Sequence, residues 1–183
     1  MEQNIEIEFK TSITKKKYLE LLEKLKLTNN IYTQVNYYFD TPTLDLNKEH
    51  KLIRIRKKPS SIRLTLKEAG DAKSIIESHV IISEATANNL IEQGFNAKKY
   101  FKNIDMELKY ITKLENNRSR IPYNNGELFL DECIYNGIVD YEIEFEVTSY
   151  SEGKKEWESL LKDFEITEVF THKKSHRALM SAK

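Results

Sequence analysis

Hydrophobic residues recur at helical spacing in several separate segments of the chain. Leu21, Leu22 and Leu25 follow Tyr18 at intervals of three and four residues, which predicts an amphipathic helix over residues 15–26. Three further helices are predicted by the same spacing and by residues typical of helix ends: one between Ser83 and Gly94, one capped by Ser151, and one from Lys174 to Met180.

Between these helices, apolar and polar residues alternate with the period of two that is typical of a half-buried strand. Asn125-Gly126 and Asn136-Gly137 are hairpin-turn signals, which predict that the last three strands form an antiparallel meander. The pattern therefore favours an α+β protein with a mainly antiparallel sheet. The predicted strands span residues 4–10, 35–40, 51–57, 61–67, 75–82, 106–121, 127–133 and 139–147.

Composition narrows the class of protein. The chain has 183 residues, with 29 Lys+Arg and 29 Asp+Glu, so no overall charge attracts it to nucleic acid or to an anionic membrane. Cys133 is the only cysteine, which excludes an internal disulfide. No apolar run approaches the ~20 residues of a membrane helix, and the first residues lack the features of a signal peptide. We expect one cytoplasmic domain over residues 1–183.

Charged residues on the predicted strands are sorted by sign. Glu6, Glu8 and Lys10 share one face of the first strand, and Glu142, Glu144 and Glu146 share one face of the last. The strands between them carry mainly arginine and lysine on the polar face. The basic residues are Arg54, Arg56, Arg63, Lys67, Arg118 and Arg120.

A solvated outer face is the ordinary explanation for one such strand, because antiparallel sheets commonly have one wet face. Sorting by sign across many strands favours a ligand instead. Rows of carboxylates repel one another unless a cation lies among them, and guanidinium groups match phosphate oxygens. A polyphosphate with a divalent cation would satisfy both sets. We expect a closed eight-stranded barrel with its charges inside and amphipathic helices covering the outside.

The order of these motifs resembles the CYTH domain, also called the triphosphate tunnel metalloenzyme family. Glu6-Ile7-Glu8-Phe9-Lys10 matches the family's E-x-E-x-K signature, and later motifs follow in the family's order over nearly the whole chain. These motifs are Tyr37-Tyr38-Phe39-Asp40-Thr41, Leu52-Ile53-Arg54-Ile55-Arg56, Leu64-Thr65-Leu66-Lys67, Leu128-Phe129-Leu130-Asp131, Tyr141-Glu142-Ile143-Glu144 and Lys174-x-x-Arg177.

The resemblance implies a role for each matching residue. It implies that Mg²⁺ or Mn²⁺ is the cofactor and that Lys10, Glu6 and Glu8 take part in catalysis. The implied metal ligands are Glu6, Glu8, Glu142, Glu144, Asp131 and Glu77. For two of them the resemblance leaves an alternative: Asp131 either joins this set or anchors a basic residue, and Glu77 is either a further ligand or a group that supports the ligands. The implied phosphate-binding residues are Lys10, Arg54, Arg56, Lys67, Arg118 and Lys174. Arg120 stands where this branch of the family often has an acidic residue, so it ranks below Arg118.

The family's activities leave three functions open. The leading hypothesis is metal-dependent hydrolysis of a small-molecule triphosphate, either inorganic tripolyphosphate or an organic one such as thiamine triphosphate. An adenylyl cyclase would use the same groups on ATP, and a non-catalytic module would bind polyphosphate or a nucleotide without turnover. We expect neither a nucleic-acid nor a membrane partner, and we expect a monomer or a homodimer.

Overall fold

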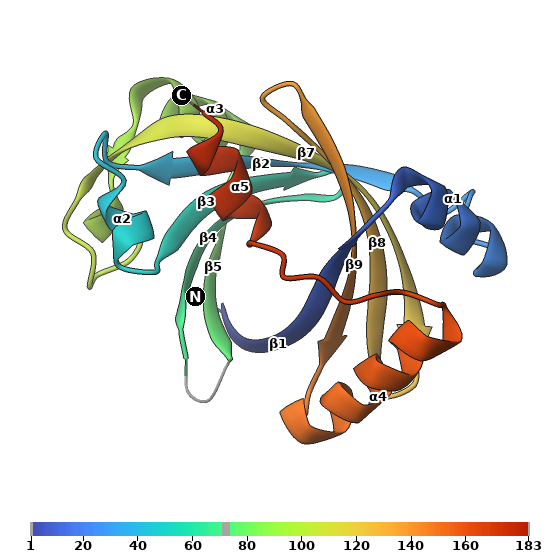
Figure 1. The fold of residues 1–183 in the computed structure, drawn as a ribbon. Coiled ribbons are helices and arrows are strands. Elements are labelled where there is room, and N and C mark those ends of the chain that lie inside the picture. The colour runs from blue at the N-terminus through green and yellow to red at the C-terminus, as the bar shows by residue number, and fades with distance from the viewer. Residues whose placement is uncertain (1, 71–73, 183) are drawn as a thin grey trace. The chain divides into compact units, whose positions relative to one another are not determined.

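The computed structural model describes residues 2–70 and 74–182, which form strands and short helices (Figure 1). The strands are β1 (Glu2–Ile13), β2 (Tyr32–Asp40), β3 (Leu52–Lys58), β4 (Ser61–Ala69), β5 (Ile75–Ile81), β6 (Phe95–Asn96), β7 (Glu107–Tyr123), β8 (Gly126–Tyr135) and β9 (Ile138–Val147). The helices are α1 (Lys15–Lys24), α2 (Asp45–Lys48), α3 (Glu84–Gln93), the 3-10 helix η1 (Ala97–Lys99), α4 (Tyr150–Asp163) and α5 (Lys174–Met180).

Strand pairing in the described part of the chain forms a cycle. The order is β2-β3-β4-β5-β1-β9-β8-β7-β6, and β2 also pairs with β7. Eight strands therefore follow one another in a closed ring of pairings, with β6 as an extra strand beside β7. The pairs β2–β3, β3–β4, β4–β5, β1–β9, β8–β9 and β7–β8 are all antiparallel. This pairing confirms the predicted α+β class and the closed antiparallel order of eight strands.

The chain divides into two compact units. Unit 1 comprises residues 1–5, 34–114 and 173–183, and unit 2 comprises residues 6–33 and 115–172. The strands β1, β2 and β7 contribute residues to both units. The expectation of a single domain over residues 1–183 stays a prediction.

Unit 1 buries one apolar face of its strands. Ile53 and Ile55 of β3 and Leu64 of β4 are fully buried, and they belong to one core with Ala87 and Leu90 of α3. The neighbouring residues on these strands, which point to the opposite face, are mostly arginine, lysine and threonine. The apolar core thus fixes which side chains of unit 1 lie on the polar face.

Unit 2 is organised in the same way. Leu128 and Leu130 of β8 and Ile143 of β9 are fully buried in a core that also contains Leu21 of α1 and Trp157 of α4. Helices α1 and α4 both contact β9 (Figure 1). The prediction that amphipathic helices cover the apolar face of the strands is confirmed within each unit.

Most predicted elements are present with shifts of a few residues at their ends, but the start of α4 was predicted wrongly. Ser149, not Ser151, is the residue before the helix, because the Gly153 N–H already donates to the Ser149 carbonyl at 2.9 Å. The ring of Tyr150 lies 5.2 Å from that of Phe9, so the first residue of α4 already packs against β1. Three short elements were not predicted: α2, β6 and η1.

The two predicted hairpins differ in outcome. Asn136 and Gly137 both have positive φ, 47° and 79°, and join β8 to β9 as predicted. The other turn is Asn124-Asn125 instead of Asn125-Gly126, because Gly126 is already paired with Tyr123. A Cβ at Gly126 would lie 2.4 Å from the Glu146 carbonyl oxygen, so close packing, not the turn, requires this glycine.

Candidate functional site

Unit 2 carries a row of carboxylates on the polar face of β9. Glu142, Glu144 and Glu146 alternate with Ile143 and Phe145, which lie in the core. Glu142 is fully buried and Glu144 is 4% exposed. Residues paired across antiparallel strands point to the same face, so this row continues onto both neighbouring strands. The paired positions are Ser12, Lys10 and Glu8 on β1, and Asp131, Phe129 and Glu127 on β8.

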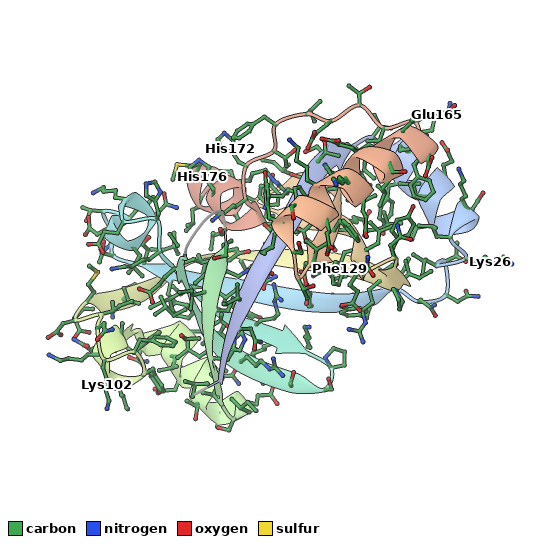
Figure 2. All side chains as sticks on the ribbon, turned by 90° about the horizontal axis from the view of Figure 1, so that it is seen from below. Lys26, Lys102, Phe129, Glu165, His172 and His176 are labelled. Carbon is green, nitrogen blue, oxygen red and sulfur yellow. The ribbon has the colours of Figure 1, made fainter. Side chains whose placement is uncertain are left out.

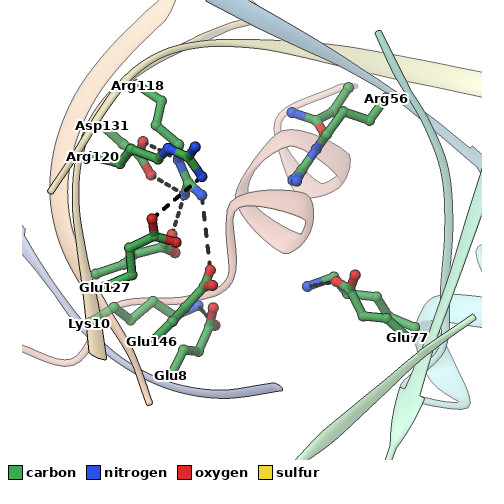
Figure 3. Close-up of polar contacts among 12 residues, drawn as sticks. Glu8, Lys10, Arg56, Glu77, Arg118, Arg120, Glu127, Asp131 and Glu146 are labelled. Atoms are coloured by element: carbon green, nitrogen blue, oxygen red, sulfur yellow. Dashed lines mark hydrogen bonds and ion pairs between the residues drawn. The ribbon is translucent and has the colours of Figure 1, made fainter. Parts of the chain in front are cut away.

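Arg118 is buried among these carboxylates (Figure 3). Its Nε donates to Asp131 Oδ1 at 2.7 Å and its Nη2 donates to Asp131 Oδ2 at 2.6 Å and to Glu144. Its guanidinium carbon lies 4.2 Å from the centre of the Phe129 ring, which Figure 2 labels. Burial by itself would lower the pKa of Arg118. The charges of Asp131 and Glu144 have the larger effect and raise this pKa well above its ordinary value. Arg118 therefore stays charged and organises the acidic row.

One group of carboxylates in this row joins β1 to β9. Carboxylate oxygens of Glu6, Glu8 and Glu146 lie within 4.8 Å of one another, and Lys10 Nζ donates to Glu8 at 2.6 Å. Burial, with the charges of Glu6, Glu144 and Glu8, raises the pKa of Glu146 to about 7, although Arg118 acts the other way. A cation among these oxygens would relieve that repulsion.

Glu146 was expected on this acidic face beside Glu142 and Glu144, but it was not among the predicted metal ligands. The signal was present in the sequence, because Glu146 continues the alternation of Glu142 and Glu144 on one face of the last strand. Its place in the group appears only with the register of β1 against β9, which sets Glu146 opposite Glu8.

A second group of carboxylates lies further along the same face. Oxygens of Asp131, Glu142 and Glu144 also lie within 4.8 Å of one another, and all three residues are buried. Both groups offer only carboxylate oxygens, the ligands that Mg²⁺ and Mn²⁺ prefer. The donor set of unit 2 therefore fits a hard divalent cation, and five of the six predicted ligands are gathered there.

Glu77, the sixth predicted ligand, lies in unit 1 among cations (Figure 3). Its carboxylate pairs with Arg54 at 3.3 Å and with Lys67. Burial raises the pKa of Glu77, but Arg54, Lys67 and Arg56 together lower it to about 2. Among the described residues, the acidic groups compact enough for one metal ion do not include Glu77.

The predicted basic residues of strands β3 and β4 lie on the polar face of unit 1. Arg54 is paired with Thr65, and Arg56 with Arg63, so these guanidinium groups occupy neighbouring rows. Arg56 Nε donates to Asn36 at 2.7 Å. The Nε atoms of Arg54 and Arg63 are buried without a hydrogen-bond partner among the described residues. Buried donors of this kind suit an anion with many oxygens.

The remaining predicted residues divide between the units. Lys174 is the first residue of α5 and belongs to unit 1 with Arg54, Arg56 and Lys67. Lys10 and Arg118 belong to unit 2, where both contact carboxylates. The predicted phosphate-binding set is thus gathered in part within unit 1, and its two members in unit 2 stand among the predicted metal ligands.

Comparison with known proteins places the chain in a family. The family model described as the CYTH domain matches residues 4–179. The chain belongs to the CYTH domain family. It is 36% identical over 179 residues to the Bacillus subtilis (strain 168) protein named "Putative triphosphatase YjbK", and the match covers 95% of this chain and 94% of YjbK.

Solved structures agree with this membership of the CYTH domain family. A Bacillus halodurans protein, bh2851, described as "a putative adenylate cyclase", is 33% identical with a TM-score of 0.89, covering 97% of this chain and 98% of that chain. HpAC1 from Hippeastrum is 20% identical with a TM-score of 0.72, covering 98% of this chain and 96% of that chain. The second similarity concerns the fold alone.

Within residues 2–70 and 74–182, every helix is too short or too polar to cross a bilayer.

Proposed function

We propose that this chain hydrolyses the phosphoric anhydride bond of a small-molecule triphosphate with the help of a divalent cation. The proposal rests on the charged side chains that each unit gathers on its polar face. Unit 2 gathers carboxylates within reach of one cation, and unit 1 buries guanidinium donors that lack partners among the described residues. The 36% identity to YjbK, named as a triphosphatase, supports the same reaction.

The acidic row is assigned to the cation. Glu6, Glu8 and Glu146 would hold one Mg²⁺ or Mn²⁺ ion. A divalent cation held there supplies positive charge that offsets charge developing on the phosphate oxygens. Asp131, Glu142 and Glu144 offer a second set of oxygens of the same kind. The assignment adds Glu146 to the predicted ligands and removes Glu77, whose carboxylate pairs with Arg54 and Lys67.

The basic residues are assigned to the phosphate chain. Arg54, Arg56, Lys67 and Lys174 would bind its non-bridging oxygens, because phosphoryl transfer depends chiefly on positioning and on stabilising spread negative charge. Glu77 would keep Arg54 and Lys67 in place before the substrate arrives.

Lys10 and Arg118 receive different roles from the other cations. Lys10 Nζ already donates to the Glu8 carboxylate at 2.6 Å, so Lys10 would act as a donor to a phosphate oxygen instead of accepting a proton from water. Arg118 is held by Asp131 and Glu144, so its first task is to fix the carboxylates of unit 2.

Phosphate release from tripolyphosphate and from thiamine triphosphate, with Mg²⁺ or Mn²⁺ and with EDTA, tests the proposal. We expect release that depends on the cation and falls by about 100-fold or more in Glu6→Gln and Arg54→Ala, since each removes a group that stabilises charge in the transition state. Glu158→Gln, an exposed change on α4, is the matched carboxylate control. Tight binding of triphosphates without turnover would replace the proposal with a binding module.

An adenylyl cyclase is the second candidate, because bh2851 is described with that activity and is 33% identical. ATP incubated with Mn²⁺ separates the two reactions. A hydrolase releases orthophosphate, whereas a cyclase forms cyclic AMP and pyrophosphate. Cyclic AMP as the main product would favour the cyclase.

A further inference from the structure

Three neighbouring strands of unit 2, β7, β8 and β9, carry a further row of polar side chains beside the acidic groups. Asn116 of β7 is paired with Cys133 of β8, and Cys133 is paired with Asp140 of β9. Glu142 lies two residues after Asp140 and so points to the same face. The four side chains therefore share one face at neighbouring positions.

Three of these four side chains are withdrawn from solvent, and Asp140 is partly exposed. Cys133 and Glu142 are fully buried and Asn116 is 1% exposed. The Cys133 sulfur and carboxylate oxygens of Asp140 and Glu142 lie within 4.8 Å of one another. Tyr135 donates its hydroxyl hydrogen to Asp140 Oδ2 at 2.5 Å, which fixes the orientation of that carboxylate.

The side-chain amide of Asn116 is a separate observation that favours a ligand beside Cys133. Both atoms of its amide group are buried without a hydrogen-bond partner in the part of the chain that the structure describes. Leaving a buried polar group unsatisfied costs about 1–3 kcal/mol. Cβ atoms of directly paired residues lie about 4.5–5.5 Å apart, which places the amide of Asn116 beside the Cys133 thiol.

We propose that Asn116, Cys133, Asp140 and Glu142 form a zinc site. Zn²⁺ in proteins takes four ligands, and thiolate sulfur and carboxylate oxygen are both among the ligands it binds, so Cys133, Asp140 and Glu142 would supply three and the Asn116 amide oxygen the fourth. Thiolate is a soft ligand that Mg²⁺ and Mn²⁺ disfavour, so Cys133 distinguishes this site from the groups that contain only carboxylates. On binding, the Cys133 thiol releases its proton to solvent and sulfur donates an electron pair to the ion.

The spacing is close to what zinc requires. Donors that each lie ~2.0–2.3 Å from one tetrahedral ion are about 3.5 Å apart. The Cys133, Asp140 and Glu142 donor atoms already lie within 4.8 Å of one another, so small side-chain shifts would bring them around one ion. Asn116 Oδ1 would complete the set, and Tyr135 would support Asp140 from outside it. The site shares Glu142 with the Asp131, Glu142 and Glu144 group, but its occupancy does not depend on triphosphate hydrolysis.

Cobalt titration of the protein over residues 1–183 tests the zinc site directly. Co²⁺ replaces Zn²⁺ with the same ligands, and a thiolate on Co²⁺ gives a charge-transfer band in the near ultraviolet. Cys133 is the only cysteine, so a band in this protein reports this one site. We expect the band in the wild type, its displacement by Zn²⁺ and its loss in Cys133→Ser.

Further variants distinguish loss of the zinc site from loss of folding and from failure of the proposed catalytic function. Asp140→Asn and Asn116→Ala should weaken cobalt binding by about 10-fold or more while far-ultraviolet circular dichroism stays native. Glu6→Gln should keep the band, because Glu6 belongs to the other group. Cobalt binding without a thiolate band, or an equal band in Cys133→Ser, would overturn the proposal, whatever the triphosphatase assay shows.

Discussion

Arg118 is the residue on which the acidic row of unit 2 depends. Its guanidinium contacts Asp131 and Glu144, and all three side chains are buried. Removing one partner from a buried charged group leaves the others uncompensated, which costs about 3–5 kcal/mol. The carboxylates of this row are also the groups assigned to a divalent cation, so a bound cation should replace part of what Arg118 supplies.

Arg118→Gln should therefore lower the free energy of unfolding by about 3–5 kcal/mol without added metal. Mn²⁺ should restore more stability to the variant than it adds to the wild type, because Asp131 and Glu144 then retain a positive partner. Urea unfolding with EDTA and with Mn²⁺ measures both effects. A loss under about 1 kcal/mol, or equal stabilisation of both proteins by Mn²⁺, would contradict this role.

Glu77 should make the stability of the protein depend on pH in the acid range. Its pKa is about 2 in the folded protein against an ordinary value of 4.5, so its contribution to stability is present above pH 4.5 and is lost as the pH falls through about 2. The shift corresponds to a contribution on the order of 3 kcal/mol.

Glu77→Gln should remove that pH dependence. Between pH 5 and pH 2 the wild type should lose about 3 kcal/mol more of its unfolding free energy than the variant does, whatever the variant's stability at pH 5. Guanidinium unfolding at several pH values measures the difference. Parallel curves for the two proteins would show that Arg54 and Lys67 do not hold this carboxylate ionised.

Gly153 shows how tightly α4 rests on β9. A Cβ built at Gly153 would lie 2.5 Å from Val147 Cγ2 and 3.0 Å from Val147 Cβ. Val147 is branched at Cβ and stiff, so it yields little. The close contact between helix and strand therefore requires glycine here, although glycine is a poor helix former.

Gly153→Ala should destabilise the protein by about 1–2 kcal/mol, because overpacking outweighs the gain in helix propensity of ~1 kcal/mol. Adding Val147→Ala should recover part of the loss, and thermal unfolding of the two single variants and the double variant measures the coupling. A stabilised Gly153→Ala protein would show that α4 can move away from β9 at little cost.

Among the helices and strands, the sequence pattern predicted the ends of those elements that are fixed by residues close by in the chain. Ser83 and Gly94 lie at the ends of α3 as predicted, and the Ser83 hydroxyl accepts from the Thr86 N–H. The short helix α2 was missed because Asp40 of β2 holds its start, with Asp40 accepting from the backbone N–H groups of Leu46 and Asn47. No periodicity reveals a carboxylate that reaches back along the chain in this way.

For the whole molecule, the alternation of charge along the strands predicted which side chains share a face. It could not predict strand register, so the pairing of Glu146 with Glu8 was missed. It also did not show that Arg118 is the basic residue that Asp131 anchors, or that Glu77 would contact Arg54 and Lys67. These partners depend on which strands meet and on where buried charges find compensation.

Ligand binding should stabilise the whole chain. At 100 times the dissociation constant, a ligand that binds only the folded state adds about 2.7 kcal/mol of stability, which for a chain of this size raises Tm by about 5–10 °C. Thermal unfolding with Mg²⁺ alone, tripolyphosphate alone and both together measures this. We expect the largest shift with both, and no shift under any condition would contradict binding of either ligand.

Steady-state hydrolysis of tripolyphosphate at varied Mg²⁺ concentration is the most direct test of the proposed function. We predict phosphate release only with the cation, a higher Mg²⁺ requirement in Glu146→Gln, and a higher KM for tripolyphosphate in Arg56→Ala. Phosphate release that persists in EDTA, or that is unchanged in both variants, would contradict the assignment of carboxylates to the cation and of guanidinium groups to the triphosphate.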